Sequence, residues 1–354
     1  MKPTLVLPVA GRTSRFGGAR PKWLLTHPRG TLMITESIRG LNPRQFGKIV
    51  VIALESHEKD HEFSKALAGE LVEEYSLDKS AVKVVLLQKE TSSQAETVFE
   101  GVKQAKISGP VLVKDSDNYF HLEKLPEGNW VSVVNLDKSG PYVLQDKSYV
   151  RASENLLVKE IVEKKIVSNL FCCGGYYFED AKDFNDYFVK LKGDSVKYLS
   201  QVVQRMVAEG KDFQALEAGS FEDWGTREDW VRFKGKYRTL FVELDGVVVL
   251  DSSRHFEPKW GKTEALRRNV SIINKLHDSG TCEVILLSSR KESAKAETIE
   301  QLRKNSVKYH RVIFGLFNGS KRVLVTPYSE DSSFPAAVSL NTKLDDDRLD
   351  EFLQ

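Results

Sequence analysis

Cysteine is scarce in this sequence, with 3 residues among 354. Cys172, Cys173 and Cys282 are too few, and too unevenly placed, for the disulfide framework of a small secreted domain. Long apolar runs are also lacking, since no stretch approaches the roughly 18 uncharged apolar residues of a membrane span. The apolar start, Thr4–Ala10, is too short for a signal peptide. We therefore expect a cytoplasmic protein in a reducing compartment, without membrane insertion.

An excess of charge of either sign is absent as well, because 52 Lys and Arg residues against 50 Asp and Glu residues give a formal net charge of +2. This balance argues against nucleic acid as a partner, so an anionic ligand must be held by a local group of cations. Hydrophobic residues make up 41% of the chain and charged residues 29%, as in a globular rather than a disordered protein. At roughly 100–200 residues per domain, the length favours two domains.

Short apolar runs alternate with helix-period segments from the N-terminus to about residue 232, a pattern that predicts helices packed on a mostly parallel sheet. The predicted strands of this part are Leu5–Ala10, Ile49–Leu54, Val82–Leu87, Val111–Val113 and Val131–Val134. The basic and polar stretch Phe233–Lys236 interrupts the alternation. We place a domain boundary there, which gives a first domain of residues 1–232 and a second of residues 233–354.

The second domain repeats the alternation on a smaller scale. Its predicted elements are strand Thr239–Leu244, helix Thr263–His277, strand Val284–Leu287, a helix through Ile299 and Leu302, and strand Val323–Val325. Both domains are therefore predicted to be α/β, each with a mostly parallel sheet flanked by helices.

Small residues follow the first predicted strand and lead into basic ones. They are Ala10, Gly11, Arg12, Thr13, Ser14 and Arg15, with Pro21 and Lys22 shortly after. A turn of small residues between strand and helix lets backbone N–H groups approach the phosphates of a nucleotide. Arg15 has a planar fork that can hold phosphate oxygens, and Lys22 is a compact charge suited to a phosphate on which negative charge develops. The alternative is a plain strand–turn–helix with basic residues on its surface.

Carboxylates follow another predicted strand. Val111–Val113 leads into Asp115 and Asp117, at the carboxyl end of the strand, where open α/β sheets bind ligands. Asp223 comes much later, ahead of a predicted helix over Arg227–Val231. Because Mg²⁺ in a nucleotide site prefers carboxylate oxygens and water, Asp117 and Asp223 are candidate metal ligands, with Asp115 as a helper or substitute. Aspartates that merely favour turns after strands are the alternative.

Taken in order, the loop with Arg15, the Pro21-Lys22 pair, Asp117 and the Asp-x-Gly-Thr turn at Asp223 resemble the motifs of the sugar-phosphate nucleotidyltransferases. The resemblance covers about residues 3–232 and implies a Rossmann-like, GT-A-type α/β fold. It implies that residues 10–14 bind the nucleotide together with Gln88, Ser93 and Gln94, which resemble the segment that contacts the base. For the segment around Gln94, the alternative is a helix cap followed by a solvent-exposed helix face.

The same resemblance extends to an acceptor site. Glu163, Lys164 and Gly175 are similar to the segments that hold the hydroxyls and the phosphate of the second substrate. A surface ion pair between Glu163 and Lys164 is the alternative.

The activity that the resemblance implies is Mg²⁺-dependent transfer of a nucleotidyl group from a nucleoside triphosphate to a sugar 1-phosphate. Pyrophosphate would be released, and the nucleoside-diphosphate sugar would serve capsular polysaccharide or other glycoconjugate synthesis. In this scheme Arg15 holds the triphosphate, Lys22 the transferring phosphate and Lys164 the acceptor, while Asp117 and Asp223 hold Mg²⁺. A phosphorylated alcohol as acceptor, giving a cytidylyl product, stays open, and the resemblance also suggests a homo-oligomer.

In the second domain, Leu240–Val247 resembles the first motif of the haloacid-dehalogenase-like (HAD-like) hydrolases, Asp-x-Asp-Gly after an apolar strand. Glu243 stands at the nucleophile position and Asp245 at the general-acid position. Ser288 resembles the phosphate-binding hydroxyl of the second motif, and Lys321 the lysine of the third. The longer glutamate displaces its carboxylate by on the order of 1 Å, which can cost around a hundredfold in rate. We expect a small capless HAD-like domain with little or no phosphatase activity, and a phosphatase that uses Asp245 is the alternative.

Overall fold

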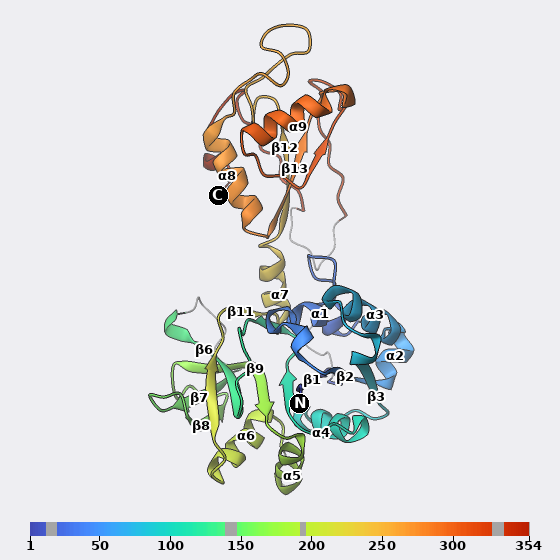
Figure 1. The fold of residues 1–354 in the computed structure, drawn as a ribbon, viewed down its shortest axis with the longest axis vertical. Coiled ribbons are helices and arrows are strands. Elements are labelled where there is room, and N and C mark those ends of the chain that lie inside the picture. The colour runs from blue at the N-terminus through green and yellow to red at the C-terminus, as the bar shows by residue number, and fades with distance from the viewer. Residues whose placement is uncertain (12–19, 139–146, 192–195, 328–335, 354) are drawn as a thin grey trace. The chain divides into compact units, whose positions relative to one another are not determined.

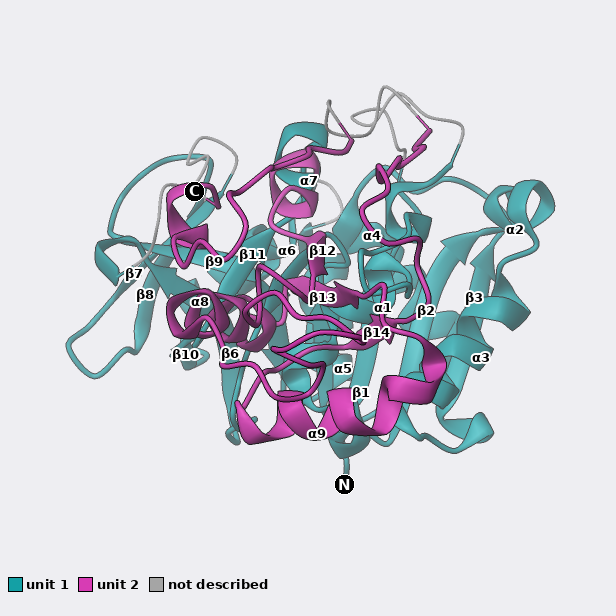
Figure 2. Cartoon of the chain, turned by 90° about the horizontal axis from the view of Figure 1, so that it is seen from above, with its two compact units in different colours: residues 1–230 teal, residues 231–354 magenta. Residues whose placement is uncertain are grey.

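The computed structural model describes residues 1–11, 20–138, 147–191, 196–327 and 336–353. The chain divides into unit 1, Met1–Trp230, and unit 2, Val231–Gln354 (Figure 2). Helix α7 (Arg227–Lys234) runs across this division.

Unit 1 is built on one large mixed sheet (Figure 1). Its strands are β1 (Thr4–Pro8), β2 (Lys48–Leu54), β3 (Val82–Leu87), β4 (Val111–Lys114), β6 (Asn129–Asn135), β7 (Ser148–Ala152), β8 (Val158–Glu163), β9 (Leu170–Phe178) and β10 (Phe213–Glu217). The main path has the order β10-β6-β9-β4-β1-β2-β3, and β7 joins β8 to β9. Strands β4, β1, β2 and β3 are parallel, whereas β9 runs antiparallel to β4 and β6. The predicted α/β class is confirmed.

Helices cover both faces of this sheet. They are α1 (Met33–Ser37), α2 (Glu55–His61), α3 (Ser64–Tyr75), α4 (Gln94–Ala105), α5 (Ala181–Leu191) and α6 (Leu199–Ala208). Successive strand residues point to opposite faces, so Val6 joins one core with residues of α4, α5 and α6, while Leu5 and Leu7 join another with residues of α1 and α3. The two-sided burial explains why the parallel strands appear in the sequence as continuous apolar runs.

Unit 2 has a small parallel sheet of strands β12 (Arg238–Glu243), β13 (Cys282–Leu287) and β14 (Arg311–Ile313) in that order. Helices α8 (Arg267–Asp278) and α9 (Lys295–Lys304) supply Val270, Ile273 and Leu302 to its core. Helix α8 begins later than the predicted start at Thr263, because Ala265 still bridges to Val249.

The strand predicted over Val323–Val325 is wrong. The structure has no strand there, and Val323 and Val325 are 76% and 90% exposed. The third position of the sheet belongs to Arg311–Ile313, which follows α9 after a short loop and pairs with β13. An apolar triplet matches a strand in composition, but only burial against a neighbouring strand makes one.

The acidic tail of unit 2 caps a helix. The Asp347 carboxylate accepts the backbone N–H groups of Arg268 (3.1 Å) and Asn269 (2.8 Å) in the first turn of α8. These N–H groups have no partner within the helix, and a carboxylate there is also favoured by the helix dipole. The tail therefore stabilises the start of α8.

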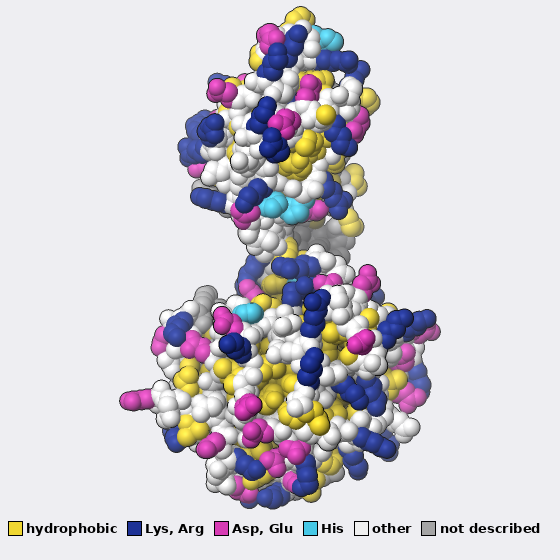
Figure 3. Space-filling model, in the orientation of Figure 1, with side chains coloured by type: hydrophobic (Ala, Val, Ile, Leu, Met, Phe, Trp, Pro, Cys, Tyr) yellow, Lys and Arg dark blue, Asp and Glu magenta, His cyan; other side chains and the backbone are white. Residues whose placement is uncertain are grey.

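Neither unit presents a single sign of charge on the face seen in Figure 3, where basic and acidic side chains are interspersed. The described helices include none that is long and apolar enough to span a bilayer.

Candidate active site

The candidate site lies beyond the carboxyl ends of β1 and β4, which are parallel neighbours in the sheet. Ala10 and Gly11 follow β1, with Ala10 buried and Gly11 exposed. Arg12, Thr13, Ser14 and Arg15 lie outside the described residues. The part of the predicted site that the structure describes therefore begins with Lys22 and the aspartates.

Asp117 and Asp223 are far apart in sequence and close in space. Strand β5 (Asn118–Phe120) pairs antiparallel with β11 (Phe221–Asp223), which places Asn118 opposite Asp223. The Trp224 backbone N–H also donates to the Asp117 carbonyl at 2.9 Å. A Cβ at Gly225 would lie 3.1 Å from Asp223 Oδ1 and 3.7 Å from Asp117 Oδ2, so these oxygens are at most about 6.8 Å apart, the sum of the two distances. The structure thus brings the two predicted carboxylates together.

Local hydrogen bonds fix the turn that follows Asp223. The Thr226 hydroxyl donates to Asp229 Oδ2 at 2.6 Å, and the Asp229 backbone N–H donates to Thr226 Oγ1 at 3.1 Å. This exchange between the residue before a helix and one in its first turn is a capping arrangement that starts α7. The Gly225 N–H donates to Asp223 Oδ1 at 3.1 Å. The Gly-Thr part of the motif therefore fixes both the helix and the aspartate.

Each carboxylate is paired with a lysine. Lys22 Nζ donates to Asp117 Oδ2, and Lys147 Nζ donates to Asp223 Oδ2. The Lys147 and Asp223 side chains are only 20% and 8% exposed. Lys22 was predicted from the sequence, whereas Lys147, which precedes β7 and belongs to no motif, was not. Only the register of the β7–β8 hairpin brings it here.

The charges shift one another's pKa values. Burial would raise the pKa of Asp117, but the charge and hydrogen bond of Lys22 outweigh it and lower that pKa to about 2. Burial, reinforced by the charge of Asp117, raises the pKa of Asp115 to about 6. Burial would lower the pKa of Lys147, yet the charge of Asp223 outweighs it and raises that pKa. The lysine-paired carboxylate Asp117 is therefore ionised at neutral pH, as a metal ligand must be.

Lys114, which the sequence reasoning also missed, lies beneath this cluster and is fully buried. Its Nζ donates to the carbonyls of Asp115 (2.6 Å) and Asn118 (3.0 Å) and to Asn118 Oδ1 (2.5 Å). Burial lowers its pKa to about 8. The three bonds fasten the turn that carries Asp117. The sequence signal that could have identified Lys114 is a lysine at the end of an otherwise apolar strand.

Helix α4 contributes Gln94 to the same region. Ser93 is its N-cap and accepts the Glu96 backbone N–H at 3.1 Å, while Gln94 Nε2 donates to Asp115 Oδ1 at 2.5 Å. Gln88 is exposed just beyond β3. The cap foreseen as the alternative for this segment is thus present, and Gln94 faces the aspartates rather than solvent.

The predicted acceptor residues lie on the β7–β8 hairpin and on β9. Glu163 accepts the hydroxyls of Ser148 and Ser200, the latter at 2.7 Å, and Lys164 Nζ lies over the Tyr198 ring at 5.6 Å. Gly175 is in β9, where a Cβ would lie 2.7 Å from both Phe120 Cζ and Ser132 Oγ. Close packing alone therefore accounts for the glycine at 175.

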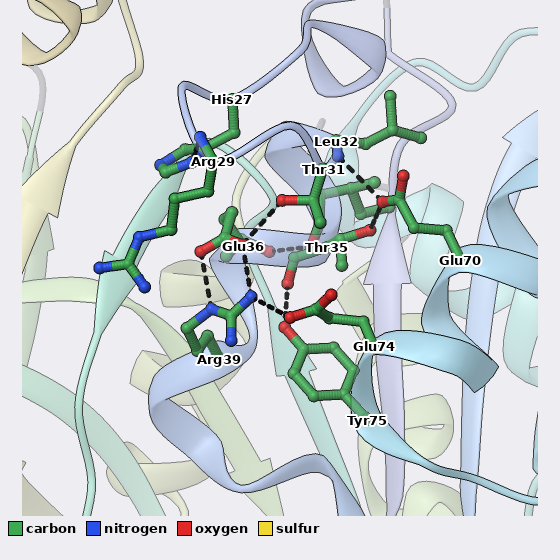
Figure 4. A network of polar contacts seen from close by, with 12 residues as sticks. His27, Arg29, Thr31, Leu32, Thr35, Glu36, Arg39, Glu70, Glu74 and Tyr75 are labelled. Atoms are coloured by element: carbon green, nitrogen blue, oxygen red, sulfur yellow. Dashed lines mark hydrogen bonds and ion pairs between the residues drawn. The ribbon is translucent and has the colours of Figure 1, made fainter. Parts of the chain in front are cut away.

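A partly buried polar network holds the segment after Lys22 (Figure 4). Arg39 donates to both Glu36 oxygens at 2.8 and 2.6 Å and to Glu74 of α3 at 2.5 Å. Glu70 of the same helix accepts the Leu32 backbone N–H at 2.9 Å. Charge-assisted bonds of this kind are stronger than neutral ones. They fasten α1, and with it the chain following Lys22, onto α3.

His27 links this segment to the one that carries Asp223. Its ring lies 5.6 Å from that of Trp224 and 6.1 Å from that of Trp230. Burial lowers the pKa of His27 to about 4, so the ring is neutral at physiological pH and packs as an aromatic group. These ring contacts hold the segment that carries Lys22 next to the segment that carries Asp223.

The donor set fits a magnesium ion bound jointly with a substrate. Among the described residues there is no cluster of three or more His, Cys, Asp or Glu side chains suited to a metal. Mg²⁺ commonly takes only one or two protein carboxylates and completes its shell with water and substrate phosphates. Asp117 and Asp223, two neighbouring carboxylates at present neutralised by lysines, meet that requirement.

In unit 2, the motif residues are engaged in ion pairs. Asp245 accepts two bonds from Arg290, at 3.0 and 2.6 Å, and Arg290 is fully buried. Glu243 accepts a bond from Arg322 at 2.8 Å. Ser288 is buried at the end of β13 and accepts the Arg290 backbone N–H at 3.1 Å.

Lys321 is exposed in the irregular segment that replaces the expected third strand. The assignment of Lys321 as the third-motif lysine relied on a strand over Val323–Val325, and that strand does not form.

No protein-family model matches this chain, and no curated protein matches it in sequence. Solved structures match it in fold. The nucleoside-diphosphate-sugar pyrophosphorylase from Vibrio cholerae RC9 gives a TM-score of 0.55 at 18% identity, over 65% of this chain and 98% of that chain. Over this part, the chain shares the α/β fold of that pyrophosphorylase. UDP-glucose pyrophosphorylase complexed with UDP-glucose gives a TM-score of 0.51 at 14% identity, over 66% of this chain and 97% of that chain.

Proposed function

We propose that unit 1 is a Mg²⁺-dependent nucleotidyltransferase that joins a nucleoside triphosphate to a sugar 1-phosphate and releases pyrophosphate. The product would be a nucleoside-diphosphate sugar for polysaccharide or glycoconjugate synthesis. The observation that supports this most is the pairing of Asp117 with Lys22 and of Asp223 with Lys147 beyond the carboxyl ends of parallel strands. Two solved structures that share the fold are named as pyrophosphorylases of nucleotide sugars.

The reaction that this site suits is attack by an acceptor phosphate oxygen on the α-phosphorus of the triphosphate. Because the acceptor is already an anion at neutral pH, no general base is needed, and positioning and charge neutralisation supply the rate. Lys22 would stabilise the negative charge that develops on the transferring phosphate. Arg15 would hold the triphosphate, and Glu163 would orient acceptor hydroxyls. Mg²⁺ bound by Asp117 and Asp223 would supply charge neutralisation for the leaving pyrophosphate.

A hydrolase activity of unit 2 is the weaker candidate. A general acid must give its proton to the leaving group, but Asp245 is held by a buried arginine through two hydrogen bonds. Glu243 is likewise paired with Arg322. We therefore propose that unit 2 has no substantial phosphatase activity.

The test is a pyrophosphate-release screen of the four nucleoside triphosphates against a panel of sugar 1-phosphates and phospho-alcohols. We expect at least one pair to react, and Lys22→Met and Asp223→Asn to lower kcat by about a hundredfold or more, on the scale of a lost oxyanion donor. Lys138→Gln is the matched control, because Lys138 is 66% exposed and its ion-pair partner is Glu217 rather than an aspartate of the site. If no pair reacts faster with the wild type than with these two site variants, the proposal fails.

The same screen separates the acceptor classes. A sugar 1-phosphate that reacts best with one triphosphate supports the proposed substrate, whereas a phospho-alcohol that reacts best with CTP supports the cytidylyl alternative.

A further inference from the structure

Two lysines stand directly opposite each other at the open end of the β7–β8 hairpin. Ser148 pairs with Glu163 in the antiparallel ladder, and one step further the Lys164 backbone N–H donates to the Lys147 carbonyl at 2.9 Å. Lys164 has a positive φ of 55°, so the regular ladder ends at Glu163, but the backbone hydrogen bond keeps both lysines at the same end of the hairpin. Two cations at one end of a hairpin form a local group that can hold an anion.

Aromatic rings support both side chains. Lys147 Nζ lies 5.6 Å from the centroid of the Phe221 ring, and Lys164 Nζ lies 5.6 Å from that of Tyr198. A lysine over an aromatic face is stabilised by the ring while its ammonium group can still donate hydrogen bonds. The Lys147 ammonium is directed to Asp223, and its side chain keeps 20% exposure.

The lysines of the site reach the carboxylates from two separate parts of unit 1. Lys22 belongs to the segment after β1 and pairs with Asp117. Lys147 belongs to the hairpin that also carries Glu163 and pairs with Asp223. Each carboxylate is therefore paired with a cation from a different segment, one from the chain after β1 and one from the hairpin.

This division matches a chemical requirement of the proposed reaction. An acceptor phosphate and a triphosphate are both strongly anionic, and the attacking oxygen must come to within about 3–3.5 Å of the phosphorus. Cations on only one of the two substrates would leave their mutual repulsion largely uncompensated. A second group of cations, facing the acceptor, removes that obstacle.

We propose that Lys147 binds the phosphate of the acceptor, together with Lys164, and that Asp223 holds Lys147 in position before the acceptor arrives. The inference rests on the proposed function of unit 1 and adds to it a residue that no sequence motif identifies. Lys147 is then a catalytic residue, because its ammonium group touches the attacking phosphate.

The first experiment measures equilibrium binding by calorimetry, with inorganic phosphate as the probe for the acceptor side and each of the four nucleoside triphosphates for the other. We expect Lys147→Gln to weaken phosphate binding at least tenfold and to change the affinity for the triphosphate that binds best by less than twofold. Lys138→Gln should leave both affinities unchanged. Unchanged phosphate affinity in Lys147→Gln, or an equal loss for phosphate and triphosphate, would overturn the assignment.

A second measurement uses the unaltered protein, in case the variant does not fold. An amine-reactive reagent labels lysines, and mass spectrometry follows the labelling rate of Lys147 and Lys138 with and without inorganic phosphate. Phosphate should slow labelling of Lys147 severalfold and leave Lys138 unaffected, and equal rates for Lys147 with and without phosphate contradict the inference.

These results are separable from the fate of the proposed function. If no substrate pair releases pyrophosphate but phosphate still protects Lys147, the proposed reaction fails and the anion site stands. If pyrophosphate is released at full rate by Lys147→Gln, with an unchanged KM for the acceptor, the reaction stands and the role of Lys147 fails.

Discussion

Gly225 offers a sharp test of the carboxylate pair, because its missing side chain leaves the space between Asp117 and Asp223 open. A methyl group at Gly225 would lie 3.1 Å from Asp223 Oδ1 and 3.7 Å from Asp117 Oδ2. The first distance is shorter than the optimum of about 3.5–4.0 Å for non-bonded heavy atoms. Gly225→Ala would thus push the Asp223 carboxylate by a few tenths of an ångström and fill part of the space that a cation would occupy.

The backbone tolerates this substitution. Gly225 is not among the glycines with positive φ, and the hydrogen bond from its N–H to Asp223 Oδ1 is available to alanine as well. At a compatible position, replacing glycine by alanine stabilises a protein by about 0.4–1 kcal/mol through the unfolded state. We therefore expect the variant to fold with its thermal midpoint unchanged or slightly raised.

Activity should fall in spite of this. A misplacement of 1 Å can cost about a hundredfold, so a smaller shift with partial occlusion predicts a ten- to hundredfold loss of kcat/KM, about 1.4–2.7 kcal/mol of transition-state stabilisation. The assay is initial-rate pyrophosphate release as a function of Mg²⁺ concentration, in which half-activation should move to higher concentration.

Gly69→Ala is the matched control, because Gly69 lies within α3 with nothing within 4 Å of its added Cβ. It should raise stability by up to about 1 kcal/mol, as expected for a helix interior, and leave activity unchanged. Wild-type activity and Mg²⁺ dependence in a folded Gly225→Ala protein would falsify the placement of the cation between these carboxylates.

The remaining predictions concern stability. Burial and the neighbouring Asp117 charge raise the pKa of Asp115 from 3.8 to about 6, so the contribution of this carboxyl group to stability falls as pH rises from about 4 to 6. Without divalent metal, the thermal midpoint of Asp115→Asn should therefore exceed that of the wild type by more at pH 7.5 than at pH 4, and a constant difference refutes this. Arg290→Met leaves the Asp245 carboxylate without its buried partner and should cost about 3–5 kcal/mol in urea unfolding of unit 2; a loss below 1 kcal/mol is incompatible with the ion pair as described. Asp347→Ala removes the cap of α8 and should cost about 1 kcal/mol, whereas an unchanged unfolding midpoint argues against the cap.

The sequence was sufficient for the α/β class because that class depends on local patterns. Apolar runs such as Ile49–Leu54 are buried on both faces of the sheet and so stand out from the amphipathic helices between them. The shorter run at Val323–Val325 is also wholly apolar but is exposed. Whether a run becomes a strand depends on a neighbour to pair with, which composition does not specify.

Asp117 was recognisable in the sequence because it follows a predicted strand, and Asp223 because it begins an Asp-x-Gly-Thr motif ahead of a predicted helix. Their proximity is a property of the fold, since it depends on the pairing of β5 with β11. Lys147 could not be identified from the sequence. Its place in the site depends on the register of the β7–β8 hairpin and on the position of Asp223. The sequence by itself thus determined which carboxylates to examine, through a local strand pattern for Asp117 and a short motif for Asp223. Only the tertiary structure decided which cations meet them, because the strand pairings that join these segments are long-range contacts.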